Sequence, residues 1–203
     1  MAGSRQITLP IAGAILAGGH SSRMGVPKAG IVLSSGETMF ELVLRQFTGL
    51  DLRCVVVGHS DGIDKSLYDD VIFLPDQIHD RGPVGALFGL FQSGIASSYL
   101  VAGCDQILLN RQLLDSLVKQ PNDRPVVFAN DTGSFSPLPG LYPETMLRIV
   151  EEVLQQESAS LRELLQKADT RMLTLQQEQF LRLRSVNTPQ ELNEYEQTLL
   201  RKS

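Results

Sequence analysis

The sequence has few of the residues from which metal centres and disulfide frameworks are built. Among its 203 residues are two cysteines and three histidines. Cys54 and Cys104 both lie inside apolar runs, which favours a role as small core residues over a disulfide or a metal pair. The histidines have neither metal-ligand spacing nor cysteine partners, so the sequence does not match a zinc site.

Long apolar runs and an excess of positive charge are also missing. No apolar run approaches the roughly 20 residues of a membrane helix, and no basic segment leads into a long apolar one, so we expect no signal peptide. A net charge of −5 argues against nucleic acid or an anionic membrane as a partner. We therefore expect a cytoplasmic protein, with residues 1–203 forming a single domain.

Short apolar runs alternate with segments of helical periodicity. Strands are predicted at 11–16, 29–33, 53–58, 71–74, 99–103, 125–128 and 135–141, with a further one near 172–175. Helices are predicted at 38–49, 82–95, 110–118, 143–156 and 160–168, and from Thr188 onward. This alternation indicates a three-layer α/β/α fold with a mostly parallel, Rossmann-like sheet. Ligands of such sheets bind beyond the carboxyl ends of the strands.

The most informative stretch is the loop LAGGHSSRMGVPK at residues 16–28, which follows the first predicted strand. Its glycines let the backbone approach a ligand, and its small residues leave N–H groups free to point at anionic oxygens. Arg23 and Lys28 add two positive charges. The loop is neither a P-loop nor the G-x-G-x-x-G fingerprint, and a glycine turn after a strand is common. The combination of glycines with two cations nevertheless predicts a phosphate site.

Two acidic residues follow predicted strands. Asp105 comes after the apolar run 99–104, where a carboxylate can hold Mg²⁺ directly or through water and join it to substrate phosphates. The alternative for Asp105 is an acid that caps the following turn. Asp76 follows Pro75, and Pro-Asp is a common turn.

Because no G-x-S-x-G elbow is present, a hydrolase triad has little support.

Five motifs together resemble the molybdenum cofactor guanylyltransferases of the nucleotidyltransferase superfamily. They are the loop at 16–28, GPVGAL at 82–87, GCD at 103–105, SPLPGLY at 136–142 and NTPQEL at 187–192. The resemblance covers most of the chain and implies a fold of the nucleotide-diphospho-sugar transferase type. After Cys-Asp the family usually has a Pro-containing turn, where this chain has Gln106-Ile107-Leu108, and a second family asparagine is replaced by Ser185.

The resemblance implies transfer of GMP from GTP to the terminal phosphate of molybdopterin, with Mg²⁺ as cofactor and release of pyrophosphate. It implies catalytic roles for Arg23, Lys28 and Asp105, with the metal on Asp105. Arg162 and Asn187 would contact molybdopterin. The residues that would bind the nucleotide are Leu16, Ala17, Gly18, Gly19, Lys28, Asp76 and Asp105. An acceptor phosphate is already anionic at neutral pH, so catalysis would rest on alignment and charge neutralisation rather than on a strong base.

Alternative functions remain open at this point. The Met-Gly-x-Pro-Lys form of the loop leans towards a molybdenum cofactor cytidylyltransferase, whereas GPVGAL leans towards guanylyl transfer. A non-catalytic nucleotide-binding adaptor of the same fold is a further alternative. A sugar-1-phosphate nucleotidyltransferase is disfavoured, because those chains are usually longer. The resemblance also implies contact with a cofactor insertase and with molybdoenzyme chaperones.

Overall fold

The centre of the computed structural model, which describes residues 9–18, 26–58, 60–78 and 80–200, is a seven-stranded sheet of order β3-β2-β1-β4-β6-β5-β7. The strands are β1 (Ala12–Leu16), β2 (Cys54–Val57), β3 (Ile72–Leu74), β4 (Ser98–Gly103), β5 (Val126–Asn130), β6 (Phe135–Pro143) and β7 (Arg171–Leu175). Among these strands β6 alone runs antiparallel to its neighbours. The predicted mostly parallel sheet is therefore confirmed.

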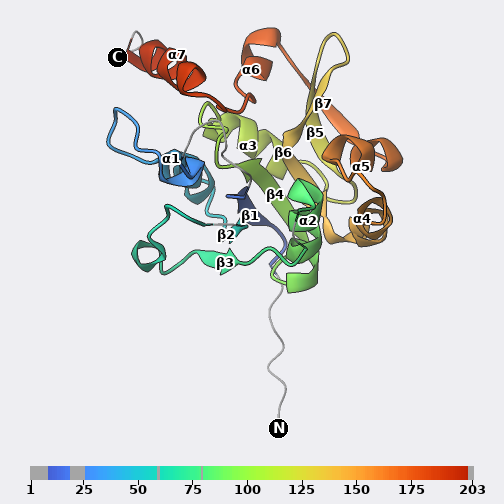
Figure 1. The fold of residues 1–203 in the computed structure, drawn as a ribbon. Helices are drawn as coiled ribbons and strands as arrows, with labels where there is room; N and C mark the ends of the chain where they lie inside the picture. Colours follow the sequence, from blue (N-terminus) through green and yellow to red (C-terminus); the bar gives the residue numbers. More distant parts are fainter. Residues whose placement is uncertain (1–8, 19–25, 59, 79, 201–203) are drawn as a thin grey trace.

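Helices cover both faces of this sheet (Figure 1). On one face lie α1 (Met39–Thr48), α3 (Arg111–Val118) and the buried Tyr195 of α7 (Pro189–Leu200); on the other lie α2 (Gly82–Ser93), α4 (Leu147–Leu154) and α5 (Leu161–Lys167). Successive residues of β1 point to opposite cores, Ile15 to the first and Ala14 and Leu16 to the second. Burial on both faces explains the continuous apolar runs of the central strands. The three-layer α/β/α prediction is confirmed.

Two helices begin with a reciprocal side-chain and backbone exchange, the capping box. At α1 the Thr38 hydroxyl accepts from the Glu41 N–H at 3.1 Å, and the Glu41 carboxylate accepts from the Thr38 N–H at 2.6 Å. The second bond lowers the pKa of Glu41. At α7 the Thr188 and Glu191 side chains and N–H groups make the same exchange, at 3.2 and 3.0 Å. Each exchange satisfies two N–H groups that a helix start otherwise leaves unpaired.

Some predicted boundaries are wrong. Residues 29–33 do not form a strand: the 3₁₀ helix η1 (Lys28–Gly30) leads into a single bridge between Val32 and Thr38. The predicted helix at 143–156 begins late, because β6 continues to Pro143 and the 3₁₀ helix η3 (Glu144–Met146) precedes α4. The helices α6 (Gln177–Leu181) and η2 (Lys65–Leu67) were not predicted. Both are too short to show helical periodicity.

Cys54 and Cys104 are free and buried, as predicted for core residues. Burial raises the pKa of both thiols to about 12, so neither is ionised to the thiolate at neutral pH.

In the part of the chain that the structure describes, no helix has the length and apolar character that crossing a bilayer requires.

Candidate active site

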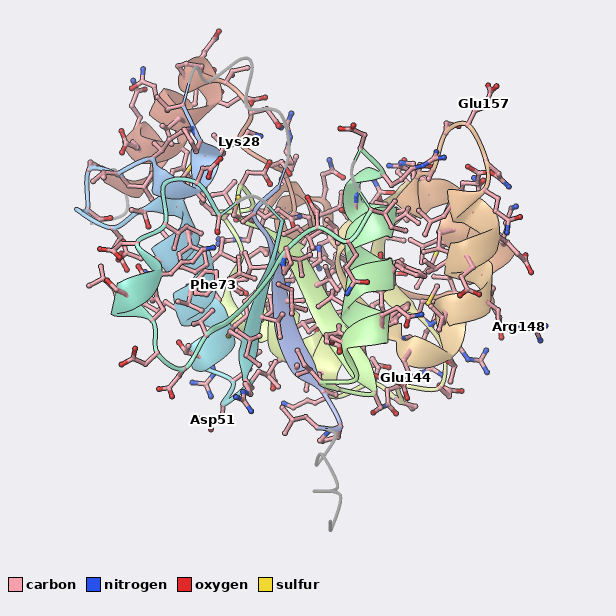
Figure 2. All side chains as sticks on the ribbon, turned by 60° about the horizontal axis from the view of Figure 1, so that its bottom comes forward. Lys28, Asp51, Phe73, Glu144, Arg148 and Glu157 are labelled. Carbon is pink, nitrogen blue, oxygen red and sulfur yellow. The ribbon has the colours of Figure 1, made fainter. Side chains whose placement is uncertain are left out.

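The first four strands end at one edge of the sheet, and the predicted phosphate-binding lysine lies at that edge. β1 to β4 are mutually parallel in the order β3-β2-β1-β4, so their carboxyl ends lie together. Figure 2 shows Lys28 at this end of the molecule, with Asp51 and Glu144 at the opposite end. The candidate site therefore lies where ligands of α/β sheets bind.

Three predicted site residues meet at a single ammonium group. The Lys28 Nζ donates to Asp105 Oδ2 at 2.9 Å and to Asn187 Oδ1 at 2.7 Å. The side chains of Lys28 and Asp105 are 18% and 19% exposed, so the ion pair is mostly shielded yet open to solvent on one side. Lys28 is 77 residues from Asp105 and 159 from Asn187 in the sequence. The fold thus joins three distant motifs into one cluster, which we call the Lys28 cluster.

Contacts through the backbone fix the two residues whose oxygens accept from Lys28. A Cβ at Gly103 would come within 2.6 Å of Asp105 Oδ1, so the absence of a side chain at Gly103 lets the carboxylate fold back over the end of β4. The Val186 N–H donates to the Asp105 carbonyl at 2.9 Å. The Asn187 N–H donates to the Glu191 carboxylate at 2.7 Å, and this bond is the main cause of the lowered pKa of Glu191. Asn187 is therefore anchored on the first turn of α7.

Gln106 supports the site from behind, a structural role that the sequence did not identify. It is 2% exposed, and its amide makes three hydrogen bonds to backbone. Its Oε1 accepts from the Gly103 N–H at 2.9 Å, and its Nε2 donates to the carbonyls of Leu138 and Leu183 at 2.8 and 2.7 Å. Gln106 joins the end of β4 to β6 and to the segment that leads to Asn187. The one available signal was a polar residue in place of the family's Pro-containing turn.

We expect Gln106→Leu to lower the free energy of unfolding by about 2–4 kcal/mol, because it leaves the buried Gly103 N–H and Leu183 carbonyl without partners. Urea unfolding followed by circular dichroism measures the change. Gln166→Leu is the matched control, since Gln166 is exposed on α5, and we expect it to stay within about 0.5 kcal/mol. A Gln106→Leu protein as stable as this control would contradict the structural role.

On the β2–β3 side of the glycine loop, Gly18 and Gly58 pass close to each other. A Cβ at Gly58 would lie 2.9 Å from the Gly18 nitrogen, and φ at Gly58 is +103°, so only glycine fits there. The same added Cβ would lie 3.5 Å from Asp76 Oδ2, which places the Asp76 carboxylate beside the loop. A cavity of about 300 Å³ opens here, lined by Gly58, Ser60, Asp61, Lys65, Phe73, Leu74, Pro75 and Asp76.

Arg162 lies on the other side of the Lys28 cluster and does not touch it. Its guanidinium donates to the Phe135 carbonyl at 2.9 Å and lies over the Phe135 ring, 4.8 Å from the centroid. Together with Pro83, Gln106 and Ser185 it lines a cavity of about 460 Å³. Asn187 borders this region, since its Nδ2 donates to the Ser185 carbonyl at 3.2 Å.

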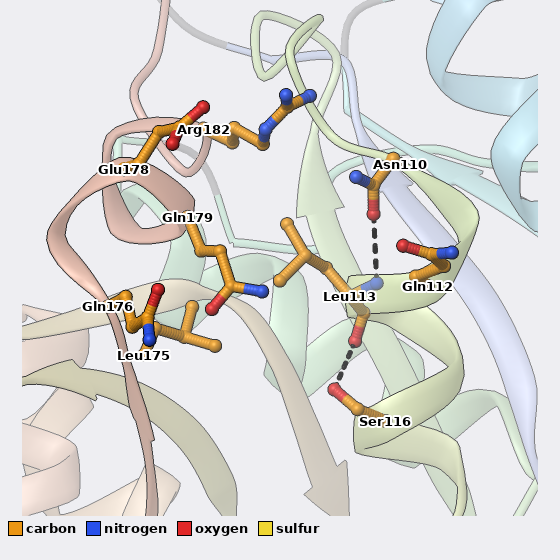
Figure 3. Close-up of a pocket in the computed structure, with 9 residues that line it drawn as sticks. All are labelled: Asn110, Gln112, Leu113, Ser116, Leu175, Gln176, Glu178, Gln179 and Arg182. Atoms are coloured by element: carbon orange, nitrogen blue, oxygen red, sulfur yellow. Dashed lines mark hydrogen bonds between the residues drawn. The ribbon is translucent and has the colours of Figure 1, made fainter.

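A third cavity lies outside the site. It has a volume of about 430 Å³ and is formed between α3 and the segment that contains α6 (Figure 3). Asn110 and Ser116 in its wall serve α3 itself: Asn110 Oδ1 accepts from the Leu113 N–H, and the Ser116 hydroxyl donates to the Leu113 carbonyl. None of the predicted site residues that the structure describes lines it.

Two predicted site residues, Gly19 and Arg23, lie outside the described residues.

Comparison with known proteins gives matches over most of the chain. Residues 13–172 match the family described as MobA-like NTP transferase domain. The chain is 26% identical over 182 residues to a probable molybdenum cofactor guanylyltransferase of Flavobacterium johnsoniae, with 89% of this chain and 93% of that protein covered. It is 30% identical over 193 residues to one of Rhodopirellula baltica, with 90% of both covered.

A solved structure has the same fold. It is the molybdopterin-guanine dinucleotide biosynthesis protein A from Archaeoglobus fulgidus, which matches with a TM-score of 0.74 and 19% identity. The match covers 94% of this chain and 99% of that one. The predicted fold of the nucleotidyltransferase type is confirmed.

Proposed function

Because the chain belongs to the family of MobA-like NTP transferase domains, we propose that it transfers GMP from GTP to the terminal phosphate of molybdopterin and releases pyrophosphate. The observation that carries the proposal is the Lys28 cluster at the carboxyl ends of the strands, where a cation, a carboxylate and an amide from three motifs come together. The relatives named molybdenum cofactor guanylyltransferase support the choice of substrates.

Backbone groups at the end of β1 supply the next part of the nucleotide site. The Leu16 carbonyl accepts from the Cys104 N–H at 3.1 Å, and the Ala17 N–H donates to the Val57 carbonyl at 2.9 Å, so both are engaged within the sheet. The Ala17 carbonyl and the Gly18 N–H bond no residue among those described. We expect these two groups to face the nucleotide, with Asp76 fixing it from the β3 side.

We propose that a magnesium ion binds at Asp105. The Asp105 carboxylate is a hard oxygen donor, and in the structure it already holds a cation, the Lys28 ammonium, at 2.9 Å. Within the described residues no group of three or more His, Cys, Asp or Glu could hold a metal by itself. A metal on Asp105 would therefore complete its shell with phosphate and water oxygens, as Mg²⁺ commonly does. When bound, Mg²⁺ would neutralise charge on the phosphates.

The chain's own residues would align the reactants. Lys28 would contact the phosphates, and Arg23 would stabilise the leaving pyrophosphate. Molybdopterin would enter from the side of Asn187 and Arg162, where the cavity of about 460 Å³ opens. Its phosphate needs no general base, because it is already an anion when it attacks the α-phosphate. The rate then depends on alignment and on positive charge held in place before the reaction.

The test is turnover of GTP and of CTP with molybdopterin, measured as pyrophosphate release and as formation of the dinucleotide. We expect GTP to be used at least about tenfold better than CTP, which corresponds to roughly 1.4 kcal/mol of discrimination. A preference for CTP would replace the proposal with a cytidylyltransferase. Nucleotide binding without pyrophosphate release would make the protein a non-catalytic adaptor.

A further inference from the structure

The carboxylate at which we propose a metal is already paired with a cation. The Lys28 ammonium bonds Asp105 Oδ2 and Asn187 Oδ1, two oxygens from separate segments, at 2.9 and 2.7 Å. Oxygen donors of these two kinds are also what a hard divalent ion selects. Since the Asp105 side chain is only 19% exposed, little of its carboxylate remains open to a second cation. The ammonium and a divalent ion at this site would therefore compete for the same carboxylate.

The geometry also indicates which bound group could draw the ammonium away from Asp105. Asp105 and Asn187 are fixed by backbone contacts, through Val186 to the first and Glu191 to the second. The Lys28 ammonium lies at the end of a flexible four-carbon side chain, so it is the group of the cluster that can move. A polyphosphate bound at the end of β1 carries several negative charges and attracts the ammonium more strongly than one carboxylate and one amide. Its binding would leave Asp105 with an unpaired charge.

We propose that Lys28 blocks the Asp105 carboxylate in the nucleotide-free protein, so that a divalent cation binds tightly only together with a nucleotide. The Asn187 amide oxygen accepts from the same ammonium and so helps to hold it against Asp105 until a nucleotide binds. The inference rests on the proposed function insofar as it places the nucleotide and the metal at this site. Linkage requires the effect to be mutual: the cation strengthens nucleotide binding by the factor by which the nucleotide strengthens cation binding.

The experiment measures Mn²⁺ binding to the intact protein without nucleotide, by electron paramagnetic resonance of the free ion. We expect Lys28→Met to bind Mn²⁺ about tenfold more tightly than the wild type, because the competing charge is gone. Lys28→Gln, which keeps a polar chain, should move in the same direction. Lys119→Met is the matched control: Lys119 forms an exposed ion pair with Asp115 on α3 at 2.5 Å, and its loss should leave Mn²⁺ affinity within about twofold.

A second titration adds a GTP analogue with a methylene group between the α- and β-phosphates. We expect the analogue to raise Mn²⁺ affinity of the wild-type site at least about tenfold, and to raise that of Lys28→Met much less. Equal or weaker Mn²⁺ binding by both Lys28 variants, with binding still lost in Asp105→Asn, would overturn the blocking role and leave the metal site intact. Mn²⁺ binding that survives Asp105→Asn would overturn both. Neither titration needs molybdopterin, so a failure of GMP transfer is a separate result.

Discussion

Asp105→Asn is expected to lower GMP transfer by about 1000-fold or more while leaving the fold intact. Asparagine has nearly the same shape and keeps an oxygen that can accept from Lys28, so the end of β4 can stay as it is. What disappears is the negative charge that would hold a divalent ion against the triphosphate. The measurement is pyrophosphate release at saturating GTP and Mg²⁺, with circular dichroism to follow the fold.

A matched control separates the loss of this one charge from the loss of any aspartate. Asp115→Asn removes the carboxylate of an ion pair with Lys119 on α3, and we expect its turnover to stay within about twofold of the wild type. Raising the Mg²⁺ concentration should restore part of the Asp105→Asn activity if the ion is held weakly rather than excluded. Turnover within tenfold of the wild type in Asp105→Asn would remove Asp105 from the catalytic machinery.

Much of the fold follows from local patterns. The buried strands β1, β2 and β4 are short apolar runs, and a parallel sheet buried on both faces requires such runs. Capping residues such as Thr38 and Thr188 mark helix starts by a bond within one turn. The edge at which Lys28 and Asp105 meet was also predictable, because both follow parallel strands and the carboxyl ends of parallel strands share an edge.

The rest depends on contacts that no local pattern contains. Gln106 is polar inside an apolar stretch, and its importance comes from carbonyls 32 and 77 residues away. Gly58 looks like an ordinary strand end, yet its conformation and the approach of Gly18 require glycine. The 3₁₀ helix at Lys28–Gly30 lies in a segment whose composition favours a strand, but none of the described strands pairs with it. In these cases tertiary contacts override local preference.

The second large effect is expected for Lys28→Met, which should lower kcat/KM for GTP by about 100- to 1000-fold. The ammonium that now bonds Asp105 and Asn187 is the described cation nearest to both oxygens, and in the proposed reaction it faces the phosphates. Stability should fall by about 1–3 kcal/mol, because methionine leaves the mostly shielded Asp105 carboxylate without its charged partner. Initial rates across GTP concentrations measure kcat and KM separately, with Lys119→Met as the control that keeps wild-type values.

The division between kcat and KM tells what the ammonium does. Negative charge builds up on the leaving pyrophosphate as the bond to the α-phosphate breaks, so a fixed cation stabilises the transition state more than bound GTP. The loss should therefore fall mainly on kcat. A rise in KM with unchanged kcat would mean that Lys28 only holds the nucleotide, and the charge that drives transfer would then have to come from Arg23 and the metal. Lys28→Arg would then restore KM, since it keeps the charge, although a guanidinium cannot reproduce the compact contact that the ammonium makes with Asp105.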